Sequence, residues 1–521
     1  MKNSKIANVL RGTIAGVSNS VILVILNLLS RNLFLEYIGI DYLSVAQVIN
    51  NLLTVIAFSE LGLFNAVIYM LYKPVSANNK EKIILILYLY RKFNQYVGIS
   101  IAIIGLLAIP TLHLFIRTDI PLSTVILIYL MNLFTVVLSY FYTYRAVLLS
   151  ANQCDYVVSI IYTIFSFIRI IIQCFIVYLT HDYIVFLIVG LAATILQNSA
   201  VFYKAGKMYP YICDISKQKI VFQNRTELLN ERKILKRNIM SMAFVKITGI
   251  AINNTDIIIA SWINTIMVGL CSNYMLISNY LKSIIGVFQN VLMHSIGISL
   301  TEKNISDRYA LFQQINLINT FIAGIVFVCL SVLWNDFIII WIGEKYVIDE
   351  ILFISILMKV VWTLITSSIW MFRDSLGLFN KVKYMLLLNT VMNILFSILL
   401  GYFVGIPGVF FATIIADIMT NFWYDSNLVY RTTFKKKNAL KYQMHIFENI
   451  ISTAILSYFL ILCMSDWNIT IFNWLFKLFI CILIYTLFFF VRFRKKRAFQ
   501  MLLQKYLYPI FRKILKRRDC F

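Results

Sequence analysis

The residues of this sequence that could do chemistry are ionisable side chains set inside long apolar runs. They are Glu60, Arg169, Lys246, Asp256, Lys282, Lys359, Asp417 and Lys477. On membrane-insertion scales a charged side chain costs about 2.5–3.5 kcal/mol at the bilayer centre, so most of these groups should face a protein interior or a wet cavity. Two alternatives stay open, snorkelling from a helix end and pairing with an interior acid, and they apply most to Lys246 and Lys477.

Five cations are candidates for a substrate cavity. Arg169, Lys282 and Lys359 lie nearest the middle of their runs, and Lys246 and Arg31 complete the set. A cavity richer in cations than in acids attracts an anion, and phosphate or pyrophosphate fits best among the groups that lipids carry. The same field would repel a cationic drug.

Two acids, Glu60 and Asp256, are candidates for coupling transport to a proton or sodium gradient. Their alternative role is to neutralise a nearby Arg or Lys. The four His and eight Cys residues are dispersed and form no CxxC pair, so we expect neither a metal site nor a cofactor. The sequence has no P-loop, GxSxG or HExxH motif and no long external segment, which argues against an enzyme.

The elements that must position these residues are membrane helices. Of the 521 residues 60% are hydrophobic and only 13% charged, and the mean hydropathy of +0.81 is too high for a soluble core. A span needs about 20 apolar residues, and continuous runs indicate helices rather than a barrel. We predict an all-α integral membrane protein with about fourteen transmembrane helices. The spans are expected at 9–30, 42–70, 93–116, 122–149, 157–180, 183–204, 238–262, 265–292, 309–333, 348–371, 384–404, 407–430, 447–464 and 470–491.

The positive charges predict the orientation of the chain. With the N-terminus inside, 36 of the 47 Lys and Arg residues fall in or at the edge of segments expected inside, and only Arg31, Arg117 and Lys345 fall in those expected outside. Both termini are therefore expected in the cytoplasm. The net charge of +24 is explained by topology and by contact with anionic inner-leaflet lipids, so no nucleic-acid partner is expected.

The same charges divide the chain. A basic cytoplasmic linker at 205–237 separates six spans in an N-terminal lobe at 1–204 from six in a C-terminal lobe at 238–431. Equal halves of this kind suggest two packed bundles around a central cavity. Two further spans occupy 432–491, and a basic, aromatic tail at 492–521 should lie on the inner leaflet.

The connector Met371–Tyr384 is too polar to sit in lipid and separates the tenth and eleventh spans. We predict that it forms a cytoplasmic gate, in which Arg373 and Asp374 make a polar latch and Gly377 eases the turn. The alternative is an ordinary loop between two membrane helices.

An ordered set of short motifs resembles bacterial polysaccharide repeat-unit flippases, and it extends to about residue 445. The motifs are RNLF at 31–34, YIG at 37–39, ELG at 60–62, LYKP at 71–74, DIII at 256–259, VG at 268–269, NY at 273–274, WIG at 341–343, FRD at 372–374, GLF at 377–379, KY at 383–384, GIPGV at 405–409, FWY at 422–424 and VYR at 429–431. The chain departs from the pattern at Ser375, where alanine is usual, and at Asp425, where a proline is expected nearby. Neither departure touches a proposed ligand.

The resemblance implies the fold of the multidrug/oligosaccharidyl-lipid/polysaccharide exporter (MOP) superfamily, with two six-helix lobes around a central cavity and two C-terminal helices. It implies a protein of the bacterial cytoplasmic (inner) membrane that flips an undecaprenyl-pyrophosphate-linked oligosaccharide to the outer leaflet by alternating access, for capsule or O-antigen synthesis. Polysaccharide polymerase and chain-length proteins are the partners it implies. Three alternatives stay open: a cation-coupled multidrug exporter, a lipid II flippase, and a non-transporting scaffold of a polysaccharide-assembly complex.

Overall fold

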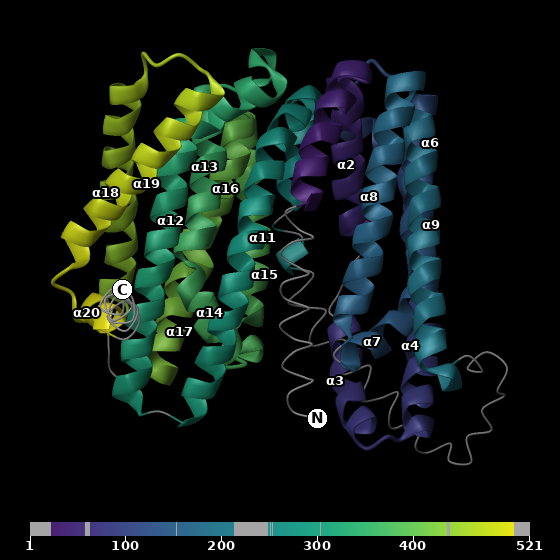
Figure 1. The fold of residues 1–521 in the computed structure, drawn as a ribbon, viewed down its shortest axis with the longest axis horizontal. Helices are drawn as coiled ribbons and strands as arrows, with labels where there is room; N and C mark the ends of the chain where they lie inside the picture. The colour runs from purple at the N-terminus through teal and green to yellow at the C-terminus, as the bar shows by residue number, and fades with distance from the viewer. Residues whose placement is uncertain are drawn as a thin grey trace, which may run out of the picture. The chain divides into compact units, whose positions relative to one another are not determined.

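The structure, a computed structural model, consists of helices joined by short turns (Figure 1). It describes residues 22–57, 63–152, 154–212, 248–250, 252, 254–302, 304–434 and 438–504. No strand occurs in these ranges, and nine of their helices are long and apolar enough to cross a membrane, or ten if one bent pair is a single span. The prediction of an all-α, multi-pass membrane protein is therefore confirmed.

Helices lie where the apolar runs predict them. The spans expected at 157–180 and 183–204 are α8 (Asp155–Thr180) and α9 (Tyr183–Met208). The chain leaves α8 through His181, whose φ is 52°, and Asp182 then caps α9 by accepting a hydrogen bond from Ile184 N at 2.7 Å. Much of the linker expected at 205–237 and of the tail at 492–521 lies outside the described residues.

The chain folds as two compact units, Met1–Ser272 and Asn273–Phe521. The division falls inside helix α11 (Thr265–Glu302) and not in the basic linker. The lobes expected at 1–204 and 238–431 stay a prediction.

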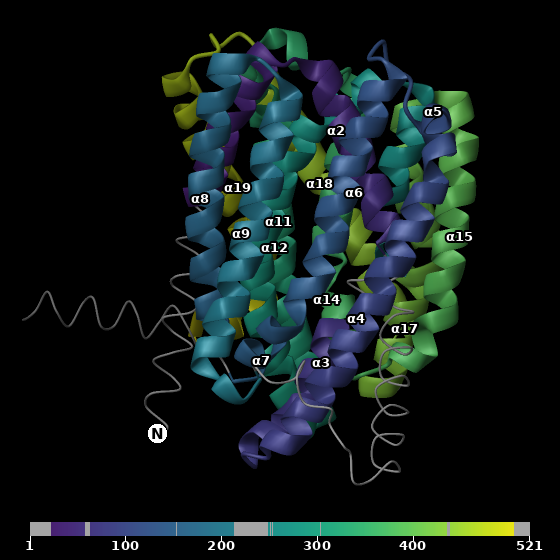
Figure 2. The same ribbon diagram turned by 90° about the vertical axis from the view of Figure 1, so that its right-hand side faces the viewer.

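The first unit packs around the short helix α7, whose residues are all buried. Val147, Leu148 and Leu149 form a cluster with apolar side chains of α3, α4 and α9. Figure 2 shows α7 beside α3. Because lipid is as apolar as these side chains, the cluster is stabilised by close packing rather than by exclusion of water. The helices of this unit are 22–37, α2 (Ile40–Ile56), α3 (Leu63–Ser76), α4 (Lys80–Ala108), α5 (Leu112–Phe115), α6 (Leu122–Tyr142), α7 (Ala146–Ala151), α8, α9 and 254–263.

Glycines bring α4 close to α6. A Cβ built on Gly105 would stand 2.5 Å from Leu133 Cδ1, and one built on Gly98 would stand 3.2 Å from Tyr140 Cβ. The buried hydroxyl of Tyr129 donates a hydrogen bond to the Gly105 carbonyl oxygen at 2.9 Å. Small residues that let backbones approach closely are a usual packing device between membrane helices.

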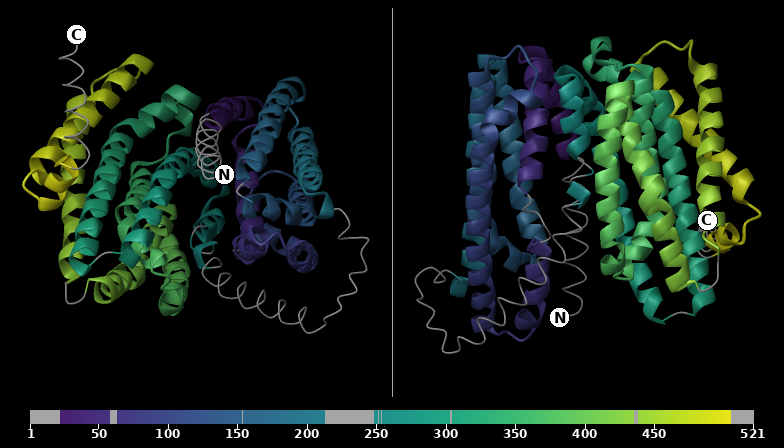
Figure 3. Two further views of the ribbon diagram at one scale, coloured as in Figure 1. Left: turned by 60° about the horizontal axis from the view of Figure 1, so that its bottom comes forward. Right: turned by 180° about the vertical axis from the view of Figure 1, so that it is seen from behind.

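Helix α12 (Ile305–Ile342) is the centre of the second unit. It has 38 residues and contacts α13, α18 and α19. Figure 3 shows α18 and α19 as the yellow-green and yellow helices of this unit. The other helices are α13 (Glu350–Ile365), α14 (Ser367–Ser375), α15 (Phe379–Val404), α16 (Ile406–Asp417), α17 (Trp423–Thr433), α18 (Leu440–Met464), α19 (Ile471–Phe493) and α20 (Arg497–Leu502).

Two helical runs of this unit are interrupted. Helices α13 and α14 meet at Thr366 with a bend of 41°, and the Thr366 hydroxyl donates to the Trp362 carbonyl oxygen at 2.8 Å. Hydroxyl bonds of this kind often bend helices. A π-helical turn at Ile418–Phe422 joins α16 to α17, and such turns are frequent at functional sites. The charged residues described next flank these two interruptions.

Candidate functional site

A charged cluster joins α14 to α17. Arg373 Nε donates to Asp374 Oδ1 at 2.8 Å, and Arg373 Nη1 donates to Asp425 Oδ2 at 2.6 Å. The side chains of Arg373 and Asp425 are only 11% and 6% exposed, so this ion pair is largely out of water. Because both side chains are so little exposed, the loss of one partner would leave the other charge buried without compensation. The ion pair therefore fixes α14 and α17 to each other.

The predicted latch thus has a third member. The contact between Arg373 and Asp374 is present, and Asp425, noted in the sequence only as a departure from the family pattern, is the more deeply buried partner of Arg373. Gly377 lies in the turn after α14 with a φ of 64°, a conformation that glycine adopts without strain. Whether the cluster gates transport stays a prediction.

A second carboxylate, the half-buried Asp417, lies next to the π-helical turn. It accepts hydrogen bonds from Trp362 Nε1 at 2.8 Å and from Asn389 Nδ2 at 3.1 Å. These bonds connect α16 to α13 and α15. The sequence identifies Asp417 as a charged group inside an apolar run, but its donors come from two other helices, which no local pattern reveals.

Two of the expected cavity cations are neighbours in the second unit. Lys282 of α11 and Lys359 of α13 are both half-buried, and their positive charges repel each other. The Lys359 ammonium also lies 5.4 Å from the ring centroid of Phe410 in α16, a cation–π contact. An anion between the two ammonium groups would relieve their repulsion.

The other two cations that the structure describes belong to the first unit. Arg169 is half-buried in the middle of α8, and its buried Nε has no hydrogen-bond partner within the described ranges. Arg31 was expected in a loop after the first span, but it lies within the helix at 22–37. The helix at 22–37 therefore continues past the end of the apolar run. Arg31 is half-buried near the end of the expected span, and a charged residue there does not interrupt the helix.

The remaining candidates divide into buried, paired and undescribed residues. Asp256 is completely buried in the helix at 254–263. Lys477 donates from Nζ to Asp336 Oδ2 at 2.7 Å, with side-chain exposures of 5% and 17%, so pairing with an interior acid is the alternative that holds for it. Glu60 and Lys246 lie outside the described residues.

Comparisons with protein-family models and with characterised proteins gave no match. Comparison with solved structures gave matches over most of the chain. The lipid II flippase MurJ in an inward closed conformation superposes with a TM-score of 0.63 and 18% identity, over 92% of this chain and 99% of that one. An inward-facing MATE family multidrug resistance transporter of the MOP superfamily gives 0.59 and 15%, over 80% and 98%. A MATE transporter of Vibrio cholerae gives 0.56 and 15%, over 84% and 98%.

At these identities the likeness shows the fold alone, and it agrees with the superfamily expected from the motifs. The matched proteins are a lipid II flippase and two MATE transporters. The chain is a multi-pass membrane protein with the fold of the MOP-superfamily transporters.

Proposed function

We propose that the protein is a transporter that flips a pyrophosphate-linked lipid oligosaccharide from the inner to the outer leaflet. The observation that carries this proposal is the Lys282–Lys359 pair, two half-buried cations of like charge at membrane depth on a transporter fold. A pyrophosphate offers one charged phosphoryl group to each ammonium, and such charge-assisted hydrogen bonds are strong where water is scarce. A cationic drug would instead add a third positive charge, which disfavours the multidrug exporter.

The substrate we favour is an undecaprenyl-pyrophosphate-linked repeat unit for capsule or O-antigen synthesis. The ordered motifs from position 31 to position 431 support this choice. A lipid II flippase is the second candidate, and the superposition on MurJ over 92% of the chain favours it. Lipid II also carries a pyrophosphate, so the same lysine pair would serve either substrate. Under the first proposal the protein lies in the cytoplasmic membrane and hands its substrate to polymerase and chain-length proteins.

The lysine pair can be tested by complementation. We expect Lys282→Ala and Lys359→Ala each to lower surface polysaccharide about tenfold in cells that lack their own flippase, since each loses a charge-assisted bond to the substrate. Lys92→Ala, which removes an exposed lysine of α4, is the matched control and should keep full activity. Normal polysaccharide from both single variants and from the double variant, at normal protein levels, would refute the proposal.

A reconstituted assay separates the two substrates. Vesicles containing the purified protein are given either a labelled undecaprenyl-pyrophosphate disaccharide or labelled lipid II, and movement between leaflets is followed. Faster flipping of the disaccharide supports the repeat-unit transporter, and selective flipping of lipid II supports the second candidate. Loss of both activities in Lys282→Ala would place the lysine pair in the shared recognition of pyrophosphate.

A further inference from the structure

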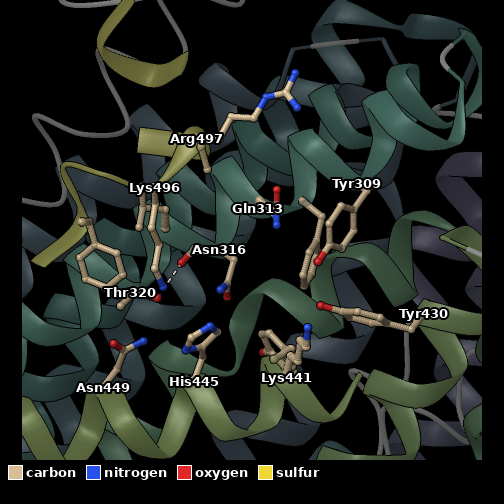
Figure 4. A pocket seen from close by; sticks show the side chains of 15 residues that line it. Tyr309, Gln313, Asn316, Thr320, Tyr430, Lys441, His445, Asn449, Lys496 and Arg497 are labelled. Atoms are coloured by element: carbon tan, nitrogen blue, oxygen red, sulfur yellow. Dashed lines mark hydrogen bonds between the residues drawn. The ribbon is translucent and has the colours of Figure 1, made fainter. Parts of the chain in front are cut away.

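A polar cavity of about 410 Å³ lies within the second unit (Figure 4). Its walls come from the first turns of α12 and α18, the end of α17, and the turn between α19 and α20. Neither Lys282 nor Lys359 lines it. The charge distribution places these helix ends on the cytoplasmic side, so the cavity opens at the level of the lipid headgroups.

The walls carry positive charge. Lys441, His445, Lys496 and Arg497 are among the lining residues, and no acidic residue is among those described. In Figure 4 the side chains of Lys441, His445 and Lys496 point into the space between the helices, whereas Arg497 extends away from it. Two ammonium groups and an imidazole thus converge from two different segments of the chain.

One carboxylate lies nearby, and it already has partners. Glu448 accepts from Arg492 Nη2 at 2.8 Å and contacts His445 Nδ1 at 2.9 Å. The carboxylate at Nδ1 holds the imidazole ring in place and leaves Nε2 for a ligand in the cavity. Burial lowers the pKa of Lys496, with Glu448 opposing the shift and Arg492 adding to it. An anion in the cavity would restore the stability of the Lys496 ammonium.

Two buried polar atoms on the wall have no hydrogen-bond partner within the part of the chain that the structure describes. They are the hydroxyl of Tyr442, a residue only 4% exposed, and Oδ1 of Asn316. Buried polar groups almost always have a hydrogen-bond partner, so we expect a bound ligand to supply one to each of these two atoms. The Tyr442 hydroxyl can donate to a phosphate oxygen, and the Asn316 amide oxygen can accept from a hydroxyl group of the ligand.

The backbone adds to this preference for an anion. Helix α18 has 25 residues and begins at Leu440, so its positive end lies beside Lys441 and Tyr442. The N-terminal N–H groups of a long helix are a common phosphate-binding element. On the opposite wall, Leu317 and Phe493 offer apolar surface, which suits the carbon skeleton of an ester.

We propose that this cavity binds one phosphate-ester anion through Lys441, His445, Lys496 and Tyr442. The ester can come from two sources, the headgroup of an anionic phospholipid in the inner leaflet or a small soluble phosphate. The site is separate from the Lys282–Lys359 pair, so its failure would leave the proposed transport function untouched.

The test uses the purified full-length protein. Native mass spectrometry compares retention of phosphatidylglycerol with that of phosphatidylcholine, and calorimetry measures binding of glycerol phosphate. The variants are the double change Lys441→Gln with Lys496→Gln, and Tyr442→Phe, which removes one oxygen and keeps the ring. Arg494→Gln is the matched control, because it removes an exposed cation of the same turn that does not line the cavity.

We expect binding to weaken about tenfold or more in the double variant and several-fold in Tyr442→Phe, with no change in Arg494→Gln. Displacement of phosphatidylglycerol by glycerol phosphate would identify a soluble ligand, and retention of the lipid alone would identify a headgroup. Equal binding by all variants, or binding of neither probe by the unaltered protein, would overturn the proposal. If the double variant does not fold, the binding measured for Tyr442→Phe alone decides whether the cavity binds the anion.

Discussion

We expect the buried ion pair between Arg373 and Asp425 to contribute measurably to the free energy of unfolding. Asp425→Asn keeps the size of the side chain but removes the charge that accepts from Arg373 Nη1 at 2.6 Å. Removing one partner of a buried ion pair costs about 3–5 kcal/mol, because the other charge stays buried. Asp374 still accepts from Arg373 Nε at 2.8 Å, and the Arg373 side chain is 11% exposed. These two compensations reduce the expected loss of unfolding free energy to about 2–3 kcal/mol.

A double-mutant cycle isolates this interaction. Arg373→Gln, Asp425→Asn and the double variant are unfolded in detergent, and tryptophan fluorescence follows each transition. Once Asp425 is neutral, Arg373→Gln no longer breaks the ion pair with Asp425 and loses only the contact with Asp374, so the double variant should lose about 2 kcal/mol less than the sum of the single losses. Strictly additive losses would refute the reasoning.

Asp374→Ala is the control inside the same cluster. Its carboxylate is 24% exposed and therefore more strongly screened, so we expect a loss of stability below about 1 kcal/mol. A loss as large as that of Asp425→Asn would show that burial does not set the strength of these contacts. If the cluster is a gate, Asp374→Ala should also change the flipping rate while the protein level in the membrane stays normal. A variant that disappears from the membrane would favour a purely structural loop.

Two further predictions concern packing inside each unit, and thermal unfolding measures both. Lys477→Met should destabilise the second unit by about 3 kcal/mol, because it leaves Asp336 buried without its partner, and adding Asp336→Leu should recover most of the loss. Gly105→Ala should cost about 1–3 kcal/mol, because its Cβ would stand 2.5 Å from Leu133. Gly286→Ala meets nothing within 4 Å and should be neutral or slightly stabilising, so equal effects at the two glycines would contradict the packing described here.

Much of the fold could be predicted because hydropathy alone locates a membrane helix. The spans expected at 447–464 and 470–491 are α18, Leu440–Met464, and α19, Ile471–Phe493. Helix α18 begins seven residues before the predicted start, since Lys441 and His445 are too polar for a hydropathy criterion but continue the backbone hydrogen bonding. The bend at Thr366 and the π-helical turn at Ile418–Phe422 contain neither Pro nor Gly, the residues from which helix breaks are usually predicted, so we did not predict these two interruptions from the sequence.

The candidate site was less predictable, because its contacts join distant positions. Position in an apolar run was enough to single out Lys282 and Lys359 as interior charges. The partner of Arg373, by contrast, lies 52 residues away at Asp425, and only the packing of α14 against α17 brings the two together. One sequence by itself does not indicate that two residues so far apart form an ion pair.

The pair between Lys477 and Asp336 bears on how the chain is assembled in the membrane. The two residues are 141 positions apart, so Asp336 enters the bilayer with α12 well before α19 is synthesised. Until then the carboxylate has no counter-charge from α19, and because Asp336 lies near the end of α12, we expect its cost to stay below the value of about 2.5–3.5 kcal/mol for a charge at the bilayer centre. Docking of α19 neutralises both charges in one step and completes the burial of α12. A chain in which α19 has not yet packed against α12 would keep an unpaired carboxylate at Asp336. That unpaired charge distinguishes the incompletely assembled protein from the folded one.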